Sequence, residues 1–297
     1  MPTDIPASHP DTPSLGLTAP LHALCFYVAA GITSFGWALC QLLGWNAAPW
    51  MPLWFCAALM IYNADRLRHD PADALNIPQR DATSARLRGI SLVILAASAA
   101  ALLALPILRR DWITLALVLG GTLVCLNYSI PLFGFRFKDV PLLKTLFAPS
   151  VVAAAVIGLP LLHEDPPADF TQFVLVSLRA WLFLLFNMIL CDLRDLNGDR
   201  RTGIRSLPVC FGERRTRLLL LALLVIIEVL GLAALACARE SRVGAWQLSC
   251  ILAPLYLGGL LVALRAPRSE RFYEWAVEGM LFLPAVSVGM TGAWPAH

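Results

Sequence analysis

Three aspartates near the middle of the chain give the strongest chemical signal in the sequence. Asp192, Asp195 and Asp199 are spaced so that a helix would present all three carboxylates on one face. Crowding like charges in this way is costly unless a cation lies among them. Mg²⁺ suits such a site, because it prefers hard oxygen ligands and commonly bridges carboxylates to a phosphate. The spacing therefore favours a site for Mg²⁺ and a polyanion.

Arginines surround these aspartates. Arg194, Arg200, Arg201 and Arg205 lie among or just after them, and guanidinium groups bind phosphate oxygens through forked hydrogen bonds. The alternative is a solvated loop in which the acids and arginines form only local ion pairs.

A second acidic segment, NADRLRHDPAD, follows the second apolar stretch of the chain. Asp65, His69 and Asp73 would share one helix face, but Pro71 should end the helix and let Asp70 turn in instead. Asp65 and either Asp70 or Asp73 are therefore candidate metal ligands, with His69 less favoured. Two such segments on one membrane face are better evidence for a metal and phosphate site than one alone.

The composition identifies the chain as a membrane protein. Only 14% of its residues are charged, against about 25% in soluble domains, and its mean hydropathy is +0.69. A membrane-spanning helix needs about 20 mainly apolar residues. We therefore expect an all-α polytopic fold. The sequence predicts nine spanning helices, at about residues 22–43, 48–63, 88–108, 112–128, 143–162, 171–191, 217–237, 245–264 and 275–293.

Positive charge is concentrated in alternate loops. Of the 23 Lys and Arg residues, eighteen lie in four loops and four lie in the opposite loops. The positive-inside rule places the basic loops in the cytoplasm, and we expect the inner membrane of a bacterium. The first twenty residues are rich in proline and lack Lys and Arg, so we expect a disordered cytoplasmic tail over 1–20 and a single transmembrane domain over 21–297. The four basic loops are residues 63–88, 129–144, 192–217 and 265–274.

The eight cysteines and two intramembrane charges need separate explanations. The cysteines form no CxxC pair and most lie in apolar runs, where cysteine is a small packing residue, so we expect neither a disulfide framework nor a zinc site. Arg179 and Glu228 lie near the middle of the sixth and seventh predicted helices. Charges at that depth face a cavity or each other. A structural Arg179–Glu228 pair and a role in binding an acceptor remain open alternatives.

Two motifs resemble those of the UbiA superfamily of intramembrane prenyltransferases. The first begins at Asp192 and continues through Gly203 and Ser206-Leu-Pro-Val to Gly212; it is similar to the family's second Asp-rich motif, with Ser206 in place of the usual Thr. Tyr128-Ser-Ile-Pro, followed by two lysines, is similar to the family's fourth loop. The acidic segment at Asp65 stands where the family has its first motif, but Ile61 and Tyr62 replace the usual Asn and Asp.

The resemblance implies nine helices around a central apolar cavity, with Asp-rich cytoplasmic loops. It implies an enzyme that uses Mg²⁺ to transfer a prenyl group from a prenyl diphosphate, through an allylic cation, to a lipophilic aromatic acceptor of a quinone, tocopherol, haem or chlorophyll-type pathway. The expected partners are the donor, the acceptor and membrane lipid, and we expect no nucleic acid. Catalytic roles are implied for Asp65, Asp192, Asp195 and Asp199; metal binding for these four and Asp70; diphosphate binding for Arg66, Lys138, Lys144 and Arg205; and substrate binding for Tyr128.

Other activities are compatible with the same motifs. A terpene cyclase on this scaffold would use the same ionisation without a separate acceptor. A non-catalytic lipid-binding or transport homologue could keep the fold with an irregular first motif. A CDP-alcohol phosphotransferase also uses aspartates and Mg²⁺ at the membrane face, but its DG-x2-AR run does not occur in this sequence.

Overall fold

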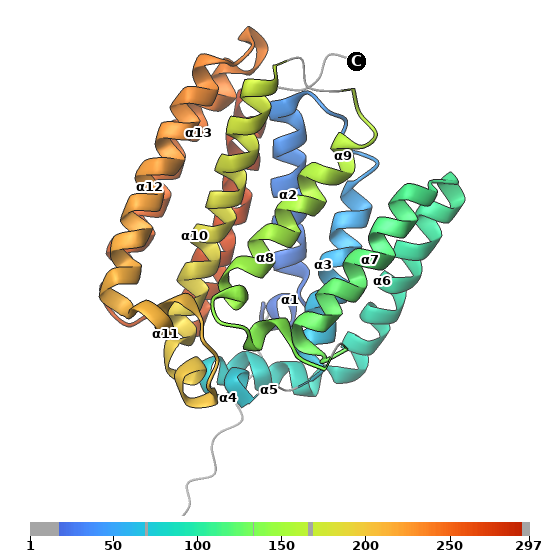
Figure 1. Ribbon diagram of the computed structural model, residues 1–297, viewed down its shortest axis with the longest axis vertical. Coiled ribbons are helices and arrows are strands. Elements are labelled where there is room, and N and C mark those ends of the chain that lie inside the picture. Colours follow the sequence, from blue (N-terminus) through green and yellow to red (C-terminus); the bar gives the residue numbers. More distant parts are fainter. Residues whose placement is uncertain (1–17, 69–70, 133, 166–168, 293–297) are drawn as a thin grey trace, which may run out of the picture.

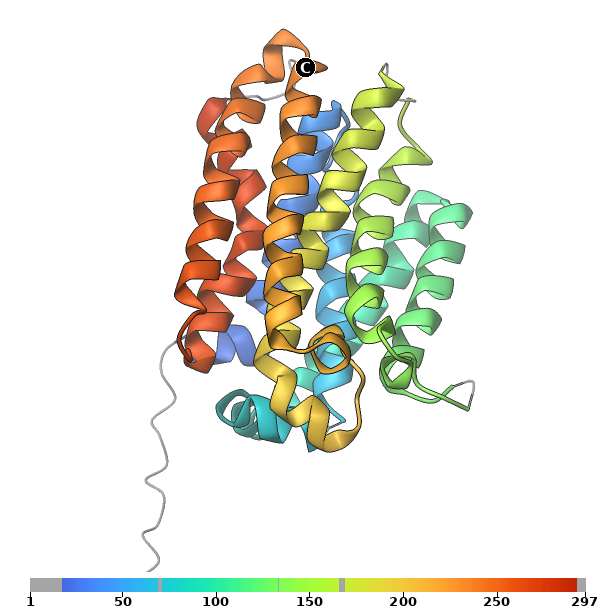
Figure 2. The ribbon, with the colours of Figure 1, turned by 60° about the vertical axis from the view of Figure 1, so that its left-hand side comes forward.

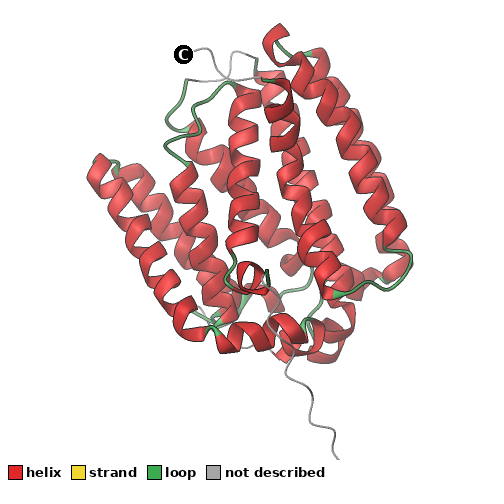
Figure 3. Ribbon diagram, turned by 180° about the vertical axis from the view of Figure 1, so that it is seen from behind, coloured by secondary structure: helices red, strands yellow, loops and turns green. Residues whose placement is uncertain are grey.

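The computed structural model describes residues 18–68, 71–132, 134–165 and 169–292, and these residues form helices and loops without any strand (Figure 3). His69 and Asp70 lie outside the described residues. The main helices are α2 (Phe26–Leu43), α3 (Met51–Arg66), α6 (Arg88–Arg109), α7 (Trp112–Ser129), α8 (Leu143–Ala153), α10 (Phe170–Thr202), α12 (Glu213–Ala236) and α13 (Glu240–Ala263).

Shorter helical segments connect the main helices. They are α1 (Ala19–Ala23), α4 (Pro71–Asn76), α5 (Pro78–Arg86), η1 (Phe137–Asp139), the π-helical η2 (Ala154–Gly158), α9 (Leu159–Leu161) and α11 (Leu207–Phe211). After α13 the chain continues as α14 (Glu270–Phe272), the π-helical η3 (Tyr273–Val277), the 3₁₀-helical η4 (Glu278–Phe282) and α15 (Leu283–Thr291).

Seven helical stretches among the described residues are long and apolar enough to cross a membrane. The structure therefore supports an all-α membrane protein, while the predicted count of nine is not confirmed. The second predicted span is α3, which has only 16 residues. The ninth is interrupted by π and 3₁₀ turns before Pro284, which has no N–H to continue a regular helix. Neither segment therefore forms an uninterrupted helix long enough to count as a membrane span.

The helices form one bundle with two projecting pairs (Figure 1, Figure 2). The pair α12–α13 lies on one side and the pair α6–α7 on the other, while α2, α3, α8 and α10 lie between them. The short helices α4, α5 and α11 gather at one end of the bundle (Figure 1). The end of α3 with Asp65 and the end of α10 with Asp192, Asp195 and Asp199 lie at the same end of the bundle, beside the end of α7.

Helix α10 is the longest element and positions the second acidic segment. The Asp169 carboxylate accepts a hydrogen bond from the backbone N–H of Gln172 at 3.1 Å and so begins the helix. Its 33 residues extend for about 50 Å, which exceeds the roughly 30 Å hydrocarbon thickness of a bilayer. Gly203 ends the helix with a φ of 78°, a left-handed conformation that suits glycine. The apolar first part of α10 can thus span the membrane while its last turns carry Asp192, Asp195 and Asp199 beyond the apolar region.

The outer faces of the projecting helices are apolar. On α12, Leu218, Leu221, Val225, Val229 and Leu232 are exposed, and their spacing gives one apolar stripe along the helix. Exposed apolar stripes of this kind are expected where a helix faces lipid rather than water.

Candidate active site

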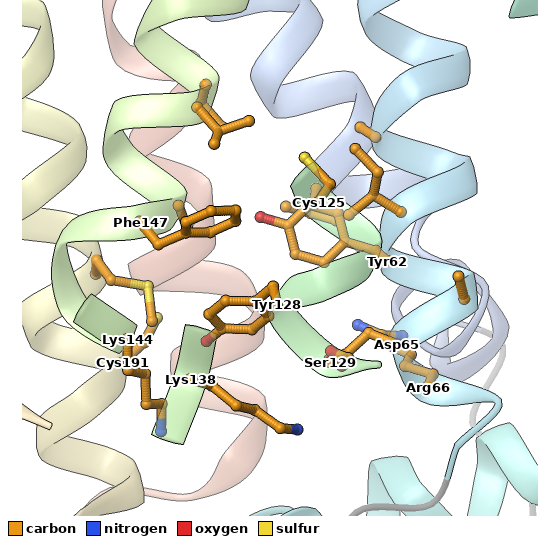
Figure 4. Close-up of a pocket in the computed structure, with 18 of the residues that line it drawn as sticks. Tyr62, Asp65, Arg66, Cys125, Tyr128, Ser129, Lys138, Lys144, Phe147 and Cys191 are labelled. Atoms are coloured by element: carbon orange, nitrogen blue, oxygen red, sulfur yellow. The ribbon is translucent and has the colours of Figure 1, made fainter. Parts of the chain in front are cut away.

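A cavity of about 280 Å³ opens between α3, α7, α8 and α10, with a polar end and an apolar end. Figure 4 shows Asp65, Lys138 and Lys144 at the polar end, with the rings of Tyr62, Tyr128 and Phe147 beside them. The apolar end extends into the bundle along α3 and α8. Its lining includes Ile32, Trp54, Ala58, Val151 and Ala155.

The three aspartates of α10 surround the ammonium group of Lys144. The Lys144 Nζ lies 2.6 Å from Asp199 Oδ2, 3.6 Å from Asp192 Oδ1 and 3.9 Å from Asp195 Oδ2. Asp192 and Asp199 have no exposed surface, and Asp195 is 8% exposed. The helical spacing thus does place the three carboxylates together, and they converge on a positive charge supplied by the start of α8.

Thr145 joins this acidic cluster to the rest of the fold. Its hydroxyl donates a hydrogen bond to Asp192 Oδ2 and accepts one from the backbone N–H of Leu207 at 3.0 Å. Since Thr145 is fully buried, it fixes Asp192 between α8 and α11. Sequence reasoning missed this residue; its position beside Lys144 was the only signal available.

Arg194 makes the forked contact that its side chain favours. Its Nε and Nη2 donate to the two carboxylate oxygens of Asp195 at 2.7 and 3.1 Å, and its guanidinium lies 5.7 Å from the ring centre of Tyr273. Arg194 also lines the cavity. It therefore orients Asp195 and adds positive charge at the polar end.

The first acidic segment meets the cavity from the end of α3. Asp65 accepts a hydrogen bond from the hydroxyl of Ser129 at the end of α7, and Arg68 donates to the backbone carbonyl of Ser129. Arg66 lines the cavity and donates to the carbonyl of His22. Asp73 also lines the cavity. Burial, and then the negative charge of Asp65, raise the pKa of Asp73 to about 6.

A close contact between α4 and α10 brings the two acidic segments together. The Asn76 side chain accepts a hydrogen bond from the backbone N–H of Gly198 at 2.9 Å. A Cβ at position 198 would lie 2.2 Å from Asn76 Oδ1 and 2.5 Å from its Cγ. A side chain at position 198 would therefore displace the Asn76 amide from this contact. The signal in the sequence is a glycine inside the aspartate-rich helix, and the motif alone does not reveal its packing role.

The segment after α13 contributes Glu278, which sequence reasoning also missed. Glu278 lines the cavity and its Oε1 lies 3.1 Å from Arg80 Nη1. Glu270 accepts hydrogen bonds from the backbone N–H groups of Gln79 and Arg80 at 3.2 Å each, which stabilises the N-terminus of α5. These contacts attach α5 to the C-terminal part of the bundle and place Arg80 at the cavity.

The remaining predicted residues differ in their positions. Tyr128 and Lys138 line the cavity, and the Tyr128 ring stacks on Phe147 with a centroid distance of 5.1 Å. Arg205 is exposed and lies outside the cavity lining; its backbone carbonyl accepts a hydrogen bond from Leu142 N–H at 2.9 Å. Of the predicted site residues that lie in the described part of the chain, all gather at the polar end of the cavity or around Lys144, except the side chain of Arg205.

Arg179 lies away from this cavity. Its Nε donates to the carbonyl of Ile227 at 3.1 Å and its Nη1 donates to Ser249 Oγ at 3.0 Å. Its guanidinium lies 5.6 Å from the ring centre of Trp246. These contacts with α12 and α13 favour a structural role for Arg179. Its partner Ile227 directly precedes Glu228 on α12.

The chemistry of the acidic cluster fits Mg²⁺. Within the described part of the chain, no three His, Cys, Asp or Glu side chains are already placed to hold a metal ion, and Lys144 Nζ lies among the three carboxylates of α10. Three carboxylates facing Lys144 and Arg194 leave one negative charge in excess. In addition, Asp192 Oδ1 is buried without a hydrogen-bond donor. Hard oxygen donors with unmet charge are the ligands that Mg²⁺ prefers.

Comparisons with known proteins agree with this architecture. The chain is 29% identical over 199 residues to a lycopene elongase/hydratase from Haloferax volcanii, covering 64% of this chain and 61% of that protein. It is 27% identical over 143 residues to a digeranylgeranylglyceryl phosphate synthase from Methanopyrus kandleri, covering 48% and 49% of the two proteins. The chain thus spans less than two thirds of either relative's length.

Solved structures share the fold. A UbiA homolog from Archaeoglobus fulgidus bound to GPP and Mg²⁺ superposes with a TM-score of 0.63 and 16% identity, covering 92% of this chain and 98% of that one. The apo structure of a UbiA homolog from Aeropyrum pernix gives a TM-score of 0.61 and 16% identity, covering 89% and 98%. The model of the UbiA prenyltransferase family matches residues 71–286. Because this match spans most of the sequence, the chain belongs to the UbiA prenyltransferase family.

Proposed function

We propose that the protein is a Mg²⁺-dependent prenyltransferase that moves a prenyl group from a prenyl diphosphate to a lipophilic aromatic acceptor. The observation that carries the proposal is a single cavity with carboxylates and basic groups at one end and apolar side chains at the other. Such a cavity matches the two parts of a prenyl diphosphate, which has a highly charged head and an apolar tail. One relative is named a digeranylgeranylglyceryl phosphate synthase and one similar structure is bound to GPP and Mg²⁺, which supports the same donor class.

The polar end would bind the diphosphate. Asp192, Asp195 and Asp199 would hold Mg²⁺ from the α10 side, and Asp65 from the α3 side; Asp70, outside the described residues, is proposed as a further ligand. Bound Mg²⁺ would neutralise charge on the departing diphosphate. Lys138, Lys144 and Arg66 would stabilise the remaining negative charge, as preorganised donors do in other enzymes.

The apolar end would protect the allylic cation. The lining side chains exclude water, which would otherwise react with the cation. The Tyr128 and Phe147 rings border the region between the charged and apolar ends (Figure 4), where the electron-rich face of a ring can stabilise a cation. Arg205 would approach the diphosphate only if its exposed side chain turned inward.

We also infer that α3 and the segment from α14 to α15 complete nine crossings, with the cavity's polar end in the cytoplasm. The four basic loops make contacts in two pairs at that end. The Leu142 N–H of the second loop donates to the Arg205 carbonyl of the third, and the Gln79 N–H of the first donates to the Glu270 carboxylate of the fourth. At the opposite end Arg109 donates to the carbonyl of Pro49 at 2.8 Å. Grouping most of the basic residues at one end is what the positive-inside rule requires of a cytoplasmic face. The host membrane would be the inner membrane of a bacterium.

The test uses the purified chain with labelled prenyl diphosphates, Mg²⁺ and lipid extracts that contain candidate acceptors. We expect release of diphosphate and a product whose mass equals acceptor plus prenyl group. A product with the mass of a cyclised prenyl chain, formed without acceptor, would favour a terpene cyclase. If the wild-type chain releases no diphosphate from any donor, with or without extract, the proposal fails and a lipid-binding or transport role is favoured.

A further inference from the structure

The apolar end of the cavity has a defined depth. From Asp65, near the polar end of α3, the lining continues to Trp54, and from Lys144 on α8 it continues to Ala155 in the adjoining turn η2. Each separation is eleven residues, or about 16 Å along a helix. Trp54 and Ala155 are therefore the deepest lining residues on their two helices.

Those two deepest residues are bonded to each other. The Trp54 indole Nε1 donates a hydrogen bond to the backbone carbonyl of Ala155 at 3.1 Å. Ala155 lies in the π-helical turn η2, where the regular hydrogen-bond pattern of α8 is interrupted. Since Trp54 is only 2% exposed, its ring joins α3 to α8 across the end of the cavity.

Gly36 on α2 fixes the position of the same ring. A Cβ built on Gly36 would lie 2.7 and 2.8 Å from two indole carbons of Trp54, and 3.1 Å from Val156 Cγ1. The indole is thus packed directly against the backbone of α2 on one side. With its hydrogen bond to Ala155 on α8, the ring is held from two helices and cannot turn away easily.

We propose that Trp54 closes the deep end of the cavity and sets the longest prenyl chain that the protein accepts. This inference rests on the proposed function, because it assumes that the apolar end holds the tail of a prenyl diphosphate. An extended isoprene unit is about 5 Å long, as expected for four carbon–carbon bonds. After the diphosphate is placed at Asp65, the depth leaves room for about two or three isoprene units. The donor is accordingly a short prenyl diphosphate.

The experiment measures two properties of the full chain in detergent, across all-trans donors with one to four isoprene units. One is kcat/KM for diphosphate release. The other is the affinity for the matching non-cleavable prenyl thiodiphosphates, which needs no turnover. In the wild type we expect both to rise with chain length up to two or three units and then to fall.

Trp54→Ala should move the optimum of both profiles to longer chains. We expect the ratio of kcat/KM for four units over two units to rise about tenfold, the scale at which apolar pockets discriminate by size. Gly36→Ala should act in the opposite direction, because the new Cβ must push the indole toward the cavity. Its optimum should become shorter by one unit.

Trp181→Ala is the matched control. Trp181 also donates an indole hydrogen bond to α8, to Ser150 Oγ at 3.1 Å, but it lies outside the cavity lining. Its length profile should equal that of the wild type. Trp54→Phe keeps a ring at position 54 and should retain the wild-type optimum. It shows whether a shift in Trp54→Ala comes from the lost ring or from a general loss of packing.

Two results separate the inference from the proposed function. If Trp54→Ala and Gly36→Ala both bind the thiodiphosphate series with the wild-type profile, the tail leaves the cavity between helices and the inference is wrong. If the binding profiles shift as expected but no variant releases diphosphate, the inference stands and the proposed reaction is wrong.

Discussion

The two acidic segments line the same cavity from different kinds of structural element. The second lies on the continuous helix α10, where Lys144 and Thr145 hold three carboxylates on one face. The first offers Asp65 at the end of α3 and Asp73 on the separate helix α4. A rigid helix keeps ligands at fixed distances, whereas two short elements can adjust their ligands separately. In the proposed site, α10 would define the position of Mg²⁺ and the first segment would complete its coordination.

The largest effect should come from the α10 cluster. Asp192→Asn removes a buried carboxylate that Thr145 and Lys144 orient, and we expect kcat/KM for diphosphate release to fall by about a thousandfold. Asp65→Asn should cost about a hundredfold, because its partner ligands can adjust. Asp139→Asn, at an exposed aspartate paired with Arg136, should leave the rate unchanged. Equal losses in Asp65→Asn and Asp192→Asn would contradict the difference between the segments.

Lys144 should stabilise the α10 cluster when metal is absent. Lys144→Met leaves the buried carboxylates of Asp192 and Asp199 without their cation, while Asp195 keeps Arg194. We expect the free energy of unfolding in EDTA to fall by about 3–5 kcal/mol. Added Mg²⁺ should restore more stability to this variant than to the wild type, as measured by thermal unfolding. Arg217→Met, which breaks an exposed ion pair with Glu213, is the control and should change stability by less than about 1 kcal/mol. A Lys144→Met variant as stable in EDTA as the wild type would refute the stabilising role.

The contact between the segments can be disrupted at Gly198. Gly198→Ala places a Cβ against Asn76, and we expect a loss of about 1–3 kcal/mol in the free energy of unfolding, together with a raised KM for the donor. Gly258→Ala, in a helix position with open space around it, should be neutral or slightly stabilising. If both variants behave alike, the approach of α4 to α10 does not depend on this glycine.

The smallest expected effect is a pH dependence from Asp73. Its pKa is raised to about 6, first by burial and then by Asp65. A raised carboxyl pKa favours the folded state at low pH, and this contribution is lost as the pH rises through about 6. Asp73→Asn should therefore be neutral near pH 4 and stabilise the metal-free protein above pH 6, by up to about 3 kcal/mol. Denaturant unfolding in EDTA measures the difference; a stability difference that does not vary with pH would contradict it.

Local patterns predicted much of the fold and one side of the site. The helical spacing of Asp192, Asp195 and Asp199 predicted their convergence, and the motif resemblance placed Tyr128, Lys138 and Lys144 at the same cavity. Hydropathy predicted most of the long helices. It could not predict the breaks between Tyr273 and Leu283, because π and 3₁₀ turns depend on packing against neighbouring helices.

The unpredicted parts of the site all depend on long-range contacts. Thr145, Asn76, Glu278 and Trp54 act through partners that are distant in sequence, and none of them belongs to a local motif. Arg205 shows the opposite case, because its motif position does not by itself direct its side chain to the cavity. A single sequence reports spacing along one element, but not which element packs against it.

The central claim is that the two acidic segments form one divided metal and diphosphate site. The most direct measurement is the hyperfine coupling between bound Mn²⁺, in place of Mg²⁺, and the phosphorus nuclei of a non-cleavable prenyl thiodiphosphate. The account predicts a coupling in the wild type and in Asp139→Asn that is lost in both Asp65→Asn and Asp192→Asn. An unchanged coupling in either Asp65→Asn or Asp192→Asn would contradict a site that needs both segments.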